Sequence, residues 1–280
     1  MNTVPRIKHA DIRTAQNVAR GNVPAMDPLE WETRVDLAAC YRLVDLYGMC
    51  DLHLNHISAR VPGKEEHFLI NPFGMMYEEI TASSLIKVDL DGKIIANANP
   101  QYTVNLPGYV IHSAIHGARE DAHCVLHTHT KAGCAVAAQK DGLLPVNQIN
   151  MEFYGKVAYH DYEGIALDLD EQKRLVADLG DKPVMILRNH GLLTVGKTAQ
   201  QAFLRMYYLE KACEIQLTAQ AAGVAMVLPS KEVCEHAERQ FNAPPPASQD
   251  GRTLSDPDGY DLAWGALLRL LDRIDPGYKN

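Results

Sequence analysis

The spacing of apolar positions predicts a chain that alternates between amphipathic helices and short strands. Asp27-Pro28-Leu-Glu30 combines a cap residue, a proline at the first helical position and an early acidic residue, so we expect a helix that begins there and ends at Gly48. The same 3.6-residue pattern predicts further helices over residues 104–119, 132–138, 167–179, 198–222 and 261–273.

Strands are predicted by apolar and alternating runs between these helices. Expected strands cover residues 50–62, the segment from Phe68, residues 123–127, 151–159 and 183–187. Residues 85–95 read as a β-hairpin, because Asp91-Gly92 is a strong signal for a tight turn. Successive hairpins favour an antiparallel contribution to the sheet.

The polar ends of the chain suggest three regions. We predict an N-terminal arm over residues 1–26, a main domain over 27–240, and a C-terminal linker and helix over 241–280. The linker expectation rests on the turn-forming composition of 241–251, which includes three consecutive prolines.

Composition narrows the classes of function. A formal net charge of −8 disfavours nucleic acid as a partner. No apolar run approaches the ~20 residues of a membrane span, and the N-terminus lacks the apolar core of a signal peptide. The six cysteines include no Cys-x-x-Cys pair and fit buried thiols in a reducing compartment. We therefore expect a cytoplasmic protein with a small-molecule substrate.

Three histidines have the pattern of a metal site. His127 and His129 are two positions apart, so on a strand both rings point to the same side. His190 follows the apolar run 183–187 and precedes Gly191, which we expect to allow a tight turn at the edge of a site. The His-Thr-His spacing alone is also compatible with two hydrogen-bonded histidines in a loop.

These motifs together resemble the class II aldolase/adducin family. The resemblance rests on Cys124-Val-Leu-His-Thr-His129 followed by Arg188-Asn-His-Gly-Leu-Leu-Thr194, and it extends from about Val35 to Gln220. It implies an α/β fold with three α/β/α layers and a central mixed, largely antiparallel sheet. It also implies that His127, His129 and His190 bind the metal, and that the protein is a homo-oligomer, specifically a tetramer.

One segment departs from the family pattern. Sugar-phosphate aldolases of the family carry Ser-Ser-Glu where this chain has Leu106, Pro107 and Gly108. The serines grip the substrate phosphate and the Glu works as acid/base, and Pro107 lacks even a backbone N–H. We therefore expect a non-phosphorylated substrate and a different acid/base group.

Other candidate residues follow from the resemblance. Asn55 matches an asparagine of the family's Gly-Asn-x-Ser segment and Gly74 a glycine that admits the substrate, although each could simply belong to a turn. His112 is a candidate proton-transfer group, or else a buried hydrogen-bonded histidine, as is His116. Tyr154 is a candidate proton donor supplied by a neighbouring subunit, and Gln148 and Glu152 compete with it for the same place.

His53 and His56 have no counterpart that we can place in the family pattern. We expect them to support neighbouring groups or to lie on the surface.

The sequence thus predicts a metal-dependent lyase, of the decarboxylase or aldolase type, acting on a small carbonyl or carboxylate compound. We expect Zn²⁺, with Mn²⁺ and Fe²⁺ as alternatives, because three imidazoles do not choose among these ions. Two other functions stay open: an adducin-like interaction module without catalysis, and a non-haem iron oxygenase on the same scaffold.

Overall fold

An eight-stranded sheet forms the centre of the computed structural model, which describes residues 26–63, 66–164, 169–243 and 260–280. The strand order is β4-β3-β2-β1-β5-β8-β7-β6. Neighbouring strands are antiparallel except for the parallel pair β6 and β7. The strands are β1 (His56–Arg60), β2 (His67–Ile70), β3 (Ile86–Asp89), β4 (Ile94–Ala96), β5 (Cys124–Thr128), β6 (Val157–His160), β7 (Val184–Leu187) and β8 (Gly191–Gly196).

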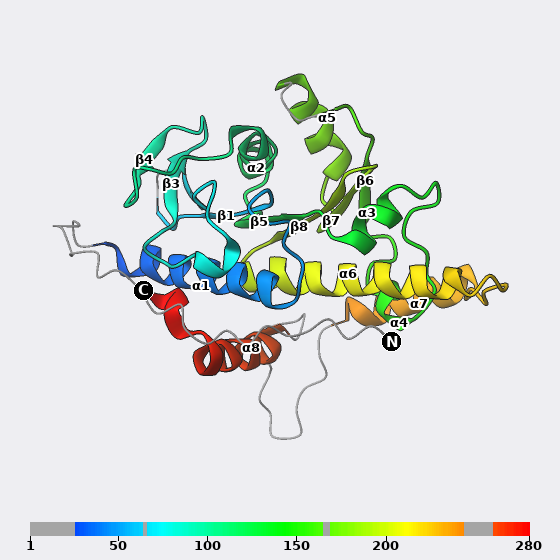
Figure 1. Cartoon of the computed structure of the whole chain (residues 1–280). Helices are drawn as coiled ribbons and strands as arrows, with labels where there is room; N and C mark the ends of the chain where they lie inside the picture. The colour runs from blue at the N-terminus through cyan, green and yellow to red at the C-terminus, as the bar shows by residue number, and fades with distance from the viewer. Residues whose placement is uncertain (1–25, 64–65, 165–168, 244–259) are drawn as a thin grey trace.

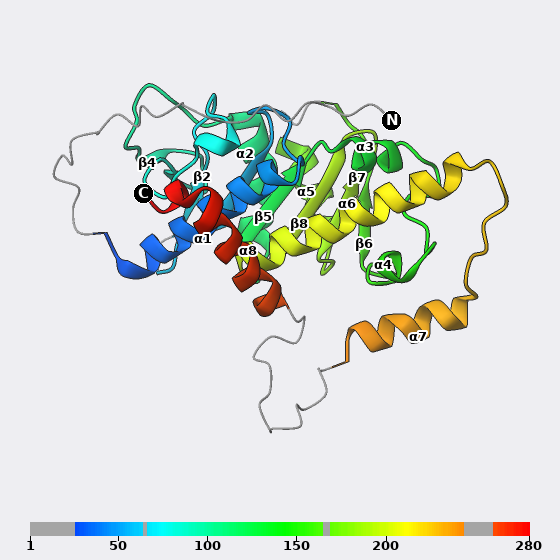
Figure 2. The same cartoon turned by 60° about the horizontal axis from the view of Figure 1, so that its bottom comes forward.

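Helices cover both faces of this sheet (Figure 1), which confirms the predicted α/β/α layers and the largely antiparallel sheet. Helices α2 and α5 lie on one side, whereas α1, α6 and α8 lie on the other. Figure 2 shows α7 beyond α6, on the side where it contacts α4. The helices are α1 (Pro28–Leu46), α2 (Leu106–Ala118), α3 (Lys131–Ala137), α4 (Gln148–Met151), α5 (Leu169–Leu179), α6 (Ala199–Ala221), α7 (Lys231–Phe241) and α8 (Tyr260–Ile274), with short 3₁₀ turns at Tyr77–Glu79 and Pro276–Lys279.

Strand β5 shows how the apolar pattern divides the core. Cys124 and Leu126 join the cluster beneath α1 and α6, while Val125 joins the cluster formed with α2 and α5. Because side chains alternate along a strand, His127 faces the same side as Val125. The strand therefore directs a polar ring toward the α2 layer at its C-terminal end.

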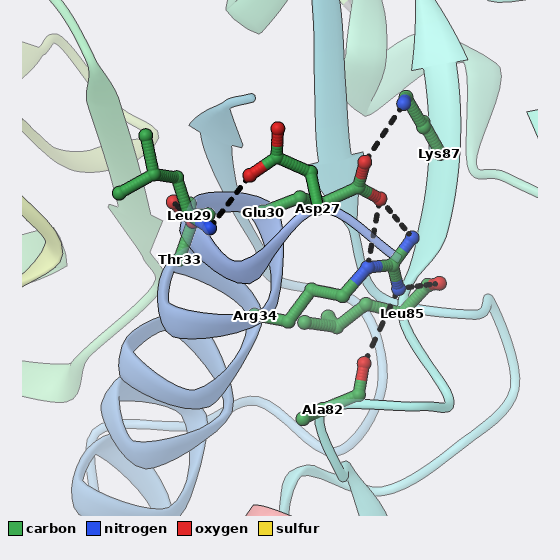
Figure 3. Close-up of polar contacts among 8 residues, drawn as sticks. All are labelled: Asp27, Leu29, Glu30, Thr33, Arg34, Ala82, Leu85 and Lys87. Carbon is green, nitrogen blue, oxygen red and sulfur yellow. Dashed lines mark hydrogen bonds and ion pairs between the residues drawn. The ribbon is translucent and has the colours of Figure 1, made fainter. Parts of the chain in front are cut away.

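Helix α1 begins as its sequence predicts and is fixed to the sheet by buried charges (Figure 3). The Asp27 side chain accepts a hydrogen bond from the Leu29 amide at 2.8 Å. Glu30 accepts from Arg34 Nε at 3.0 Å and from Lys87 Nζ on β3 at 2.9 Å. Arg34 also donates to the Leu85 carbonyl at 2.8 Å, which ties the helix to the segment before β3.

Several boundaries differ from the sequence prediction. Residues 50–55 form turns, and the strand begins only at His56. The strand predicted over 151–159 was wrong in its first half, because Met151 ends α4 and the chain then turns through Gly155 (φ 70°) before β6. Helix α7 was not predicted.

The helix predicted over 261–273 is confirmed as α8, which buries Trp264 and Leu271 in the core against α1 and α6. The predicted N-terminal arm, apart from residue 26, and most of the predicted linker lie outside the described residues, so the three-part division remains a prediction. No helix within the described ranges is long and apolar enough to cross a membrane.

Candidate metal centre

His127, His129 and His190 meet at one edge of the sheet. His127 lies near the end of β5 and His129 just after it, while His190 lies in the turn from β7 to β8. Their Nε2 atoms converge, with 2.8 Å between His127 and His129 and 2.9 Å between His129 and His190. The strand pairing of β5 with β8 brings together residues some sixty positions apart.

The partners of Nδ1 show which ring nitrogens can bind a cation. His127 Nδ1 lies 2.9 Å from the Leu192 carbonyl, and His129 Nδ1 lies 3.1 Å from a carboxylate oxygen of Asp51. Both partners are acceptors, so each Nδ1 carries the proton and each Nε2 presents a lone pair. Two lone pairs 2.8 Å apart repel each other unless a cation lies between them, so these residues fit a divalent metal.

Burial keeps the rings of His127 and His190 in the neutral form that metal ligands require. His127 is 2% exposed, and desolvation, followed by the neighbouring His190 and His129, holds its pKa well below the usual value. Desolvation and His129 lower the pKa of His190 to about 4. At neutral pH both rings can therefore donate their lone pairs without first losing a proton.

Helices α3 and α6 position the loop that carries His129. The Thr130 hydroxyl donates to the Glu210 carboxylate, which also accepts from the Gly133 amide at 3.0 Å. Glu210 lies on α6 and is 9% exposed. A side chain on the long helix thus fixes the first turn of α3 directly after His129.

The His190 turn depends on two neighbours. Asn189 adopts a left-handed backbone (φ 55°), and the Cys134 thiol donates to the His190 carbonyl at 2.9 Å. Gly191 was expected to allow a tight turn, but its φ is not positive. It is required instead by proximity, because a Cβ there would lie 2.3 Å from the Thr128 carbonyl oxygen.

Asn55 and Gly74 lie at the same sheet edge as the histidines. Asn55 directly precedes β1 and is 1% exposed, and neither polar atom of its amide has a hydrogen-bond partner among the described residues. Gly74 follows β2, which runs in the same direction as β5, and it is exposed with φ 103°. Their roles at a substrate remain predictions.

His112 lies on α2 and is separated by the ring of His56 from the three histidines His127, His129 and His190, called the triad below. Its centroid is 4.6 Å from that of His56, whose own centroid is 5.5 Å from that of His127. Burial, followed by His56 and His116, holds the pKa of His112 well below its usual value. His112 therefore stands behind His56 as a neutral ring.

Tyr154 lies far from the triad within the chain. It precedes β6, which runs parallel to β7, and the triad lies after β5 and β7. Residues before one strand and after its parallel neighbours occupy opposite edges of a sheet. Tyr154 therefore does not reach the three histidines of its own chain.

Sequence reasoning missed two residues that contact the triad. Asp51 comes from the turn after α1, and no motif marks it. His56 lies on β1 directly opposite His127 and is 5% exposed, not at the surface. The sequence did contain a signal for His56. In the family's Gly-Asn-x-Ser segment the asparagine lies two positions before the serine, and in this chain that position is His56, whereas Asn55 lies three positions before Ser58.

Comparison with known proteins agrees with this geometry. Residues 35–217 match the family model described as Class II Aldolase and Adducin N-terminal domain. The chain belongs to this family. The matched range confirms the resemblance inferred from the two histidine motifs.

Proteins similar to this chain are named either as aldolases or as adducins. A Caulobacter vibrioides protein named "Putative aldolase class 2 protein" is 49% identical over 94% of this chain and its own full length. Alpha-adducin of Rattus norvegicus is 42% identical over 91% of this chain, which corresponds to 35% of the adducin.

Two solved structures resemble most of this chain. An aldolase II superfamily protein from Pseudomonas syringae is 53% identical, with a TM-score of 0.83 over 91% of this chain and 98% of that one. An L-fuculose 1-phosphate aldolase from Glaciozyma antarctica is 29% identical, with a TM-score of 0.77 over 92% and 97%.

Proposed function

We propose that the protein is a metal-dependent lyase, of the aldolase or decarboxylase type, for a small non-phosphorylated carbonyl or carboxylate substrate. The observation that carries the proposal is the convergence of the ring nitrogens of His127, His129 and His190. These residues would hold Zn²⁺, or alternatively Mn²⁺ or Fe²⁺. A divalent ion in that place polarises a carbonyl or stabilises an enolate, which both reaction types need.

A chain of hydrogen bonds supports His112 as the proton-transfer group. His116 Nδ1 donates to the Ala122 carbonyl at 2.7 Å, so its Nε2 must accept from the Ser58 hydroxyl at 2.6 Å. Ser58 then accepts from His112 Nδ1 at 2.7 Å. His112 Nε2 is left as an unpartnered lone pair, which is the form of a general base.

The first turn of α2 supports a substrate without phosphate. Leu106 and Pro107 offer no hydroxyl, and Pro107 has no backbone N–H. This proposal differs from the sugar-phosphate cleavage that the name of the similar Glaciozyma antarctica protein, L-fuculose 1-phosphate aldolase, implies for that protein. Preferential cleavage of a sugar phosphate would contradict it.

We propose a homotetramer in which Tyr154 is the proton donor for a neighbouring subunit. At the sheet edge opposite its own triad, Tyr154 could serve only the site of a neighbouring subunit. Asn55 and Gly74 would line the substrate from the same chain as the metal ligands.

The test begins with elemental analysis of protein purified without chelator or affinity metal. We expect near-stoichiometric metal in the wild type, loss of metal in His127→Ala/His129→Ala, and no loss in His123→Ala, whose exposed side chain precedes β5. The metal found is then used to screen paired phosphorylated and unphosphorylated hydroxy carbonyl compounds for aldehyde or CO₂ release. Absence of metal, with no uptake of Zn²⁺, Mn²⁺ or Fe²⁺, would contradict the lyase proposal.

The similarity to alpha-adducin favours a second candidate, an interaction module without catalysis. Such a module would keep its binding function in His127→Ala/His129→Ala, whereas a lyase would lose turnover. An iron oxygenase on the same scaffold would instead consume oxygen with Fe²⁺ bound.

A further inference from the structure

Gly108 on α2 leaves a space that is filled by the ring of His56. A Cβ at position 108 would lie 2.3 Å from His56 Cε1 and 2.6 Å from each ring nitrogen. Real Cβ atoms do not approach other atoms so closely, so the His56 ring and any side chain at 108 exclude each other. The glycine and the histidine therefore form one structural unit.

This unit lies beside the proposed metal ligands. His56 is paired directly with His127 in the β1–β5 ladder, and the two ring centroids are 5.5 Å apart. Side chains of a directly opposed antiparallel pair share one face of the sheet. His56 therefore extends the face that presents His127.

The polar atoms of His56 lack partners, as do those of its neighbour. Both ring nitrogens of His56 and both amide atoms of Asn55 are buried without a hydrogen bond of good geometry to the described residues, although the backbone of Leu54 lies close to the ring. Buried polar groups in native proteins are nearly always paired. Four such atoms on consecutive residues beside a metal site indicate a polar ligand.

We infer that His56 is a substrate-contacting residue that hydrogen-bonds the hydroxyl group of an α-hydroxy carbonyl or α-hydroxy carboxylate substrate. The inference rests on the proposed lyase function. Gly108 is then the residue that makes room for this contact.

The donor and acceptor inventory selects a hydroxyl group. Neutral imidazole offers one N–H and one lone pair, and an amide offers both kinds as well. A phosphate or carboxylate only accepts, so it would leave both acceptors, the lone pair of His56 and Asn55 Oδ1, unpaired, whereas a hydroxyl can donate its one hydrogen to one of them while it accepts from a neighbouring N–H. The ring meets the ligand by turning about its Cβ–Cγ bond, a torsion with broad minima.

The test compares two small carboxylates that differ only in the hydroxyl group, glycolate and acetate. Their dissociation constants are measured by titrating the visible absorption of Co²⁺-loaded protein, which requires no turnover. We expect the wild type to prefer glycolate. In His56→Phe, which keeps the ring but loses both nitrogens, the preference should fall about tenfold, as the loss of one buried hydrogen bond predicts, while Co²⁺ content and acetate affinity stay the same.

Two further variants keep the test decisive if His56→Phe does not fold. His56→Gln retains a donor and an acceptor and should keep part of the preference. Gly108→Ala should lower it by displacing the ring, since alanine is otherwise a good helix residue.

The inference about His56 would be overturned if these variants kept the full glycolate preference, or if the wild type showed no such preference. Either result would leave the proposed lyase function standing. Failure to bind Co²⁺ would instead overturn the proposed function, and the inference with it.

Discussion

His129 and Asp51, 78 positions apart in the chain, are joined by a contact of 3.1 Å between Nδ1 and a carboxylate oxygen. The carboxylate holds the proton on Nδ1 and so turns the lone pair of Nε2 toward His127 and His190. A residue outside every recognisable motif thus determines the tautomer of a proposed ligand.

Replacing Asp51 should therefore weaken metal binding without removing a ligand. We expect Asp51→Ala to raise the dissociation constant for Zn²⁺ by about 10- to 100-fold, the usual effect of losing such a partner. Competition with a chromophoric chelator measures this constant. Asp51→Asn is the matched control, because its amide oxygen can still accept from Nδ1. Equal affinity in wild type and Asp51→Ala would show that the contact does not orient His129.

The sequence predicted the parts of the site that follow local rules. His127 and His129 were recognisable from their spacing after an apolar strand and His190 from its place after a second apolar run, and the family motifs supported all three. Asp51 was not recognised because no motif marks it, and the spacing that marks His56 did not reveal its place opposite His127, which depends on which strand lies beside β5. That pairing is non-local, and β1 became visible as the neighbour of β5 only in the fold.

Secondary structure shows the same division. The start of α1 was predictable because the capping contact is local: the Asp27 side chain accepts a hydrogen bond from the amide of Leu29, two positions along the chain. The segment 151–156 was misread as strand because Asn147, which caps the single turn of α4, stands outside the apolar run that was used. Short helices bury too few residues to leave a periodic signal.

Gly191 gives a prediction about close packing between β8 and β5. A Cβ there would lie 2.3 Å from the Thr128 carbonyl oxygen and 3.3 Å from both the His127 and His129 rings. We expect Gly191→Ala to lower the free energy of unfolding by about 2 kcal/mol, in the range for overpacking, and to weaken metal binding as well. Urea unfolding and the chelator competition measure the two effects.

The matched control is Gly117→Ala on α2, where the nearest atom to a Cβ is an ordinary 3.7 Å away. It should leave metal binding unchanged and should not lower the free energy of unfolding, since alanine favours a helix over glycine. Equal behaviour of the two variants would contradict the crowding argument.

His116 gives a prediction about pH. It is 1% exposed, and burial, only partly offset by the bond to the Ala122 carbonyl, lowers its pKa to about 3. An unfolded histidine titrates near 6.5, so between these values the unfolded chain binds a proton that the folded chain does not. Stability is therefore lost as pH falls below about 6.5, and His116 contributes no pH dependence above it.

The variant His116→Gln should remove this contribution. Between pH 6.5 and 5 the wild type should lose roughly 1.5 kcal/mol more of its free energy of unfolding than the variant loses. Urea unfolding of metal-free protein at pH 7.5, 6.5 and 5 provides the comparison. Parallel pH curves for the two proteins would mean that the folded and unfolded chains protonate His116 to the same extent, and would contradict the lowered pKa.

Glu30 gives a prediction about buried charge (Figure 3). Burial raises its pKa, but hydrogen bonds from Lys87 and Arg34 lower the pKa overall. Glu30→Gln would leave the guanidinium of Arg34, 3% exposed, without its counter-charge. We expect the variant to be about 3 kcal/mol less stable at pH 7, the usual cost of removing one partner of a buried ion pair.

The pH dependence of this loss follows from the lowered pKa of Glu30. The carboxylate stabilises the fold above the unfolded pKa, near 4.5, and this stabilisation disappears as pH falls through the lower folded value. The gap between wild type and Glu30→Gln in urea unfolding should therefore narrow below about pH 4.5. Glu32→Gln, on the exposed side of the same helix, controls for the change in net charge and should show little effect. A gap that persists unchanged at acid pH would locate the contribution of Glu30 in packing and not in its charge.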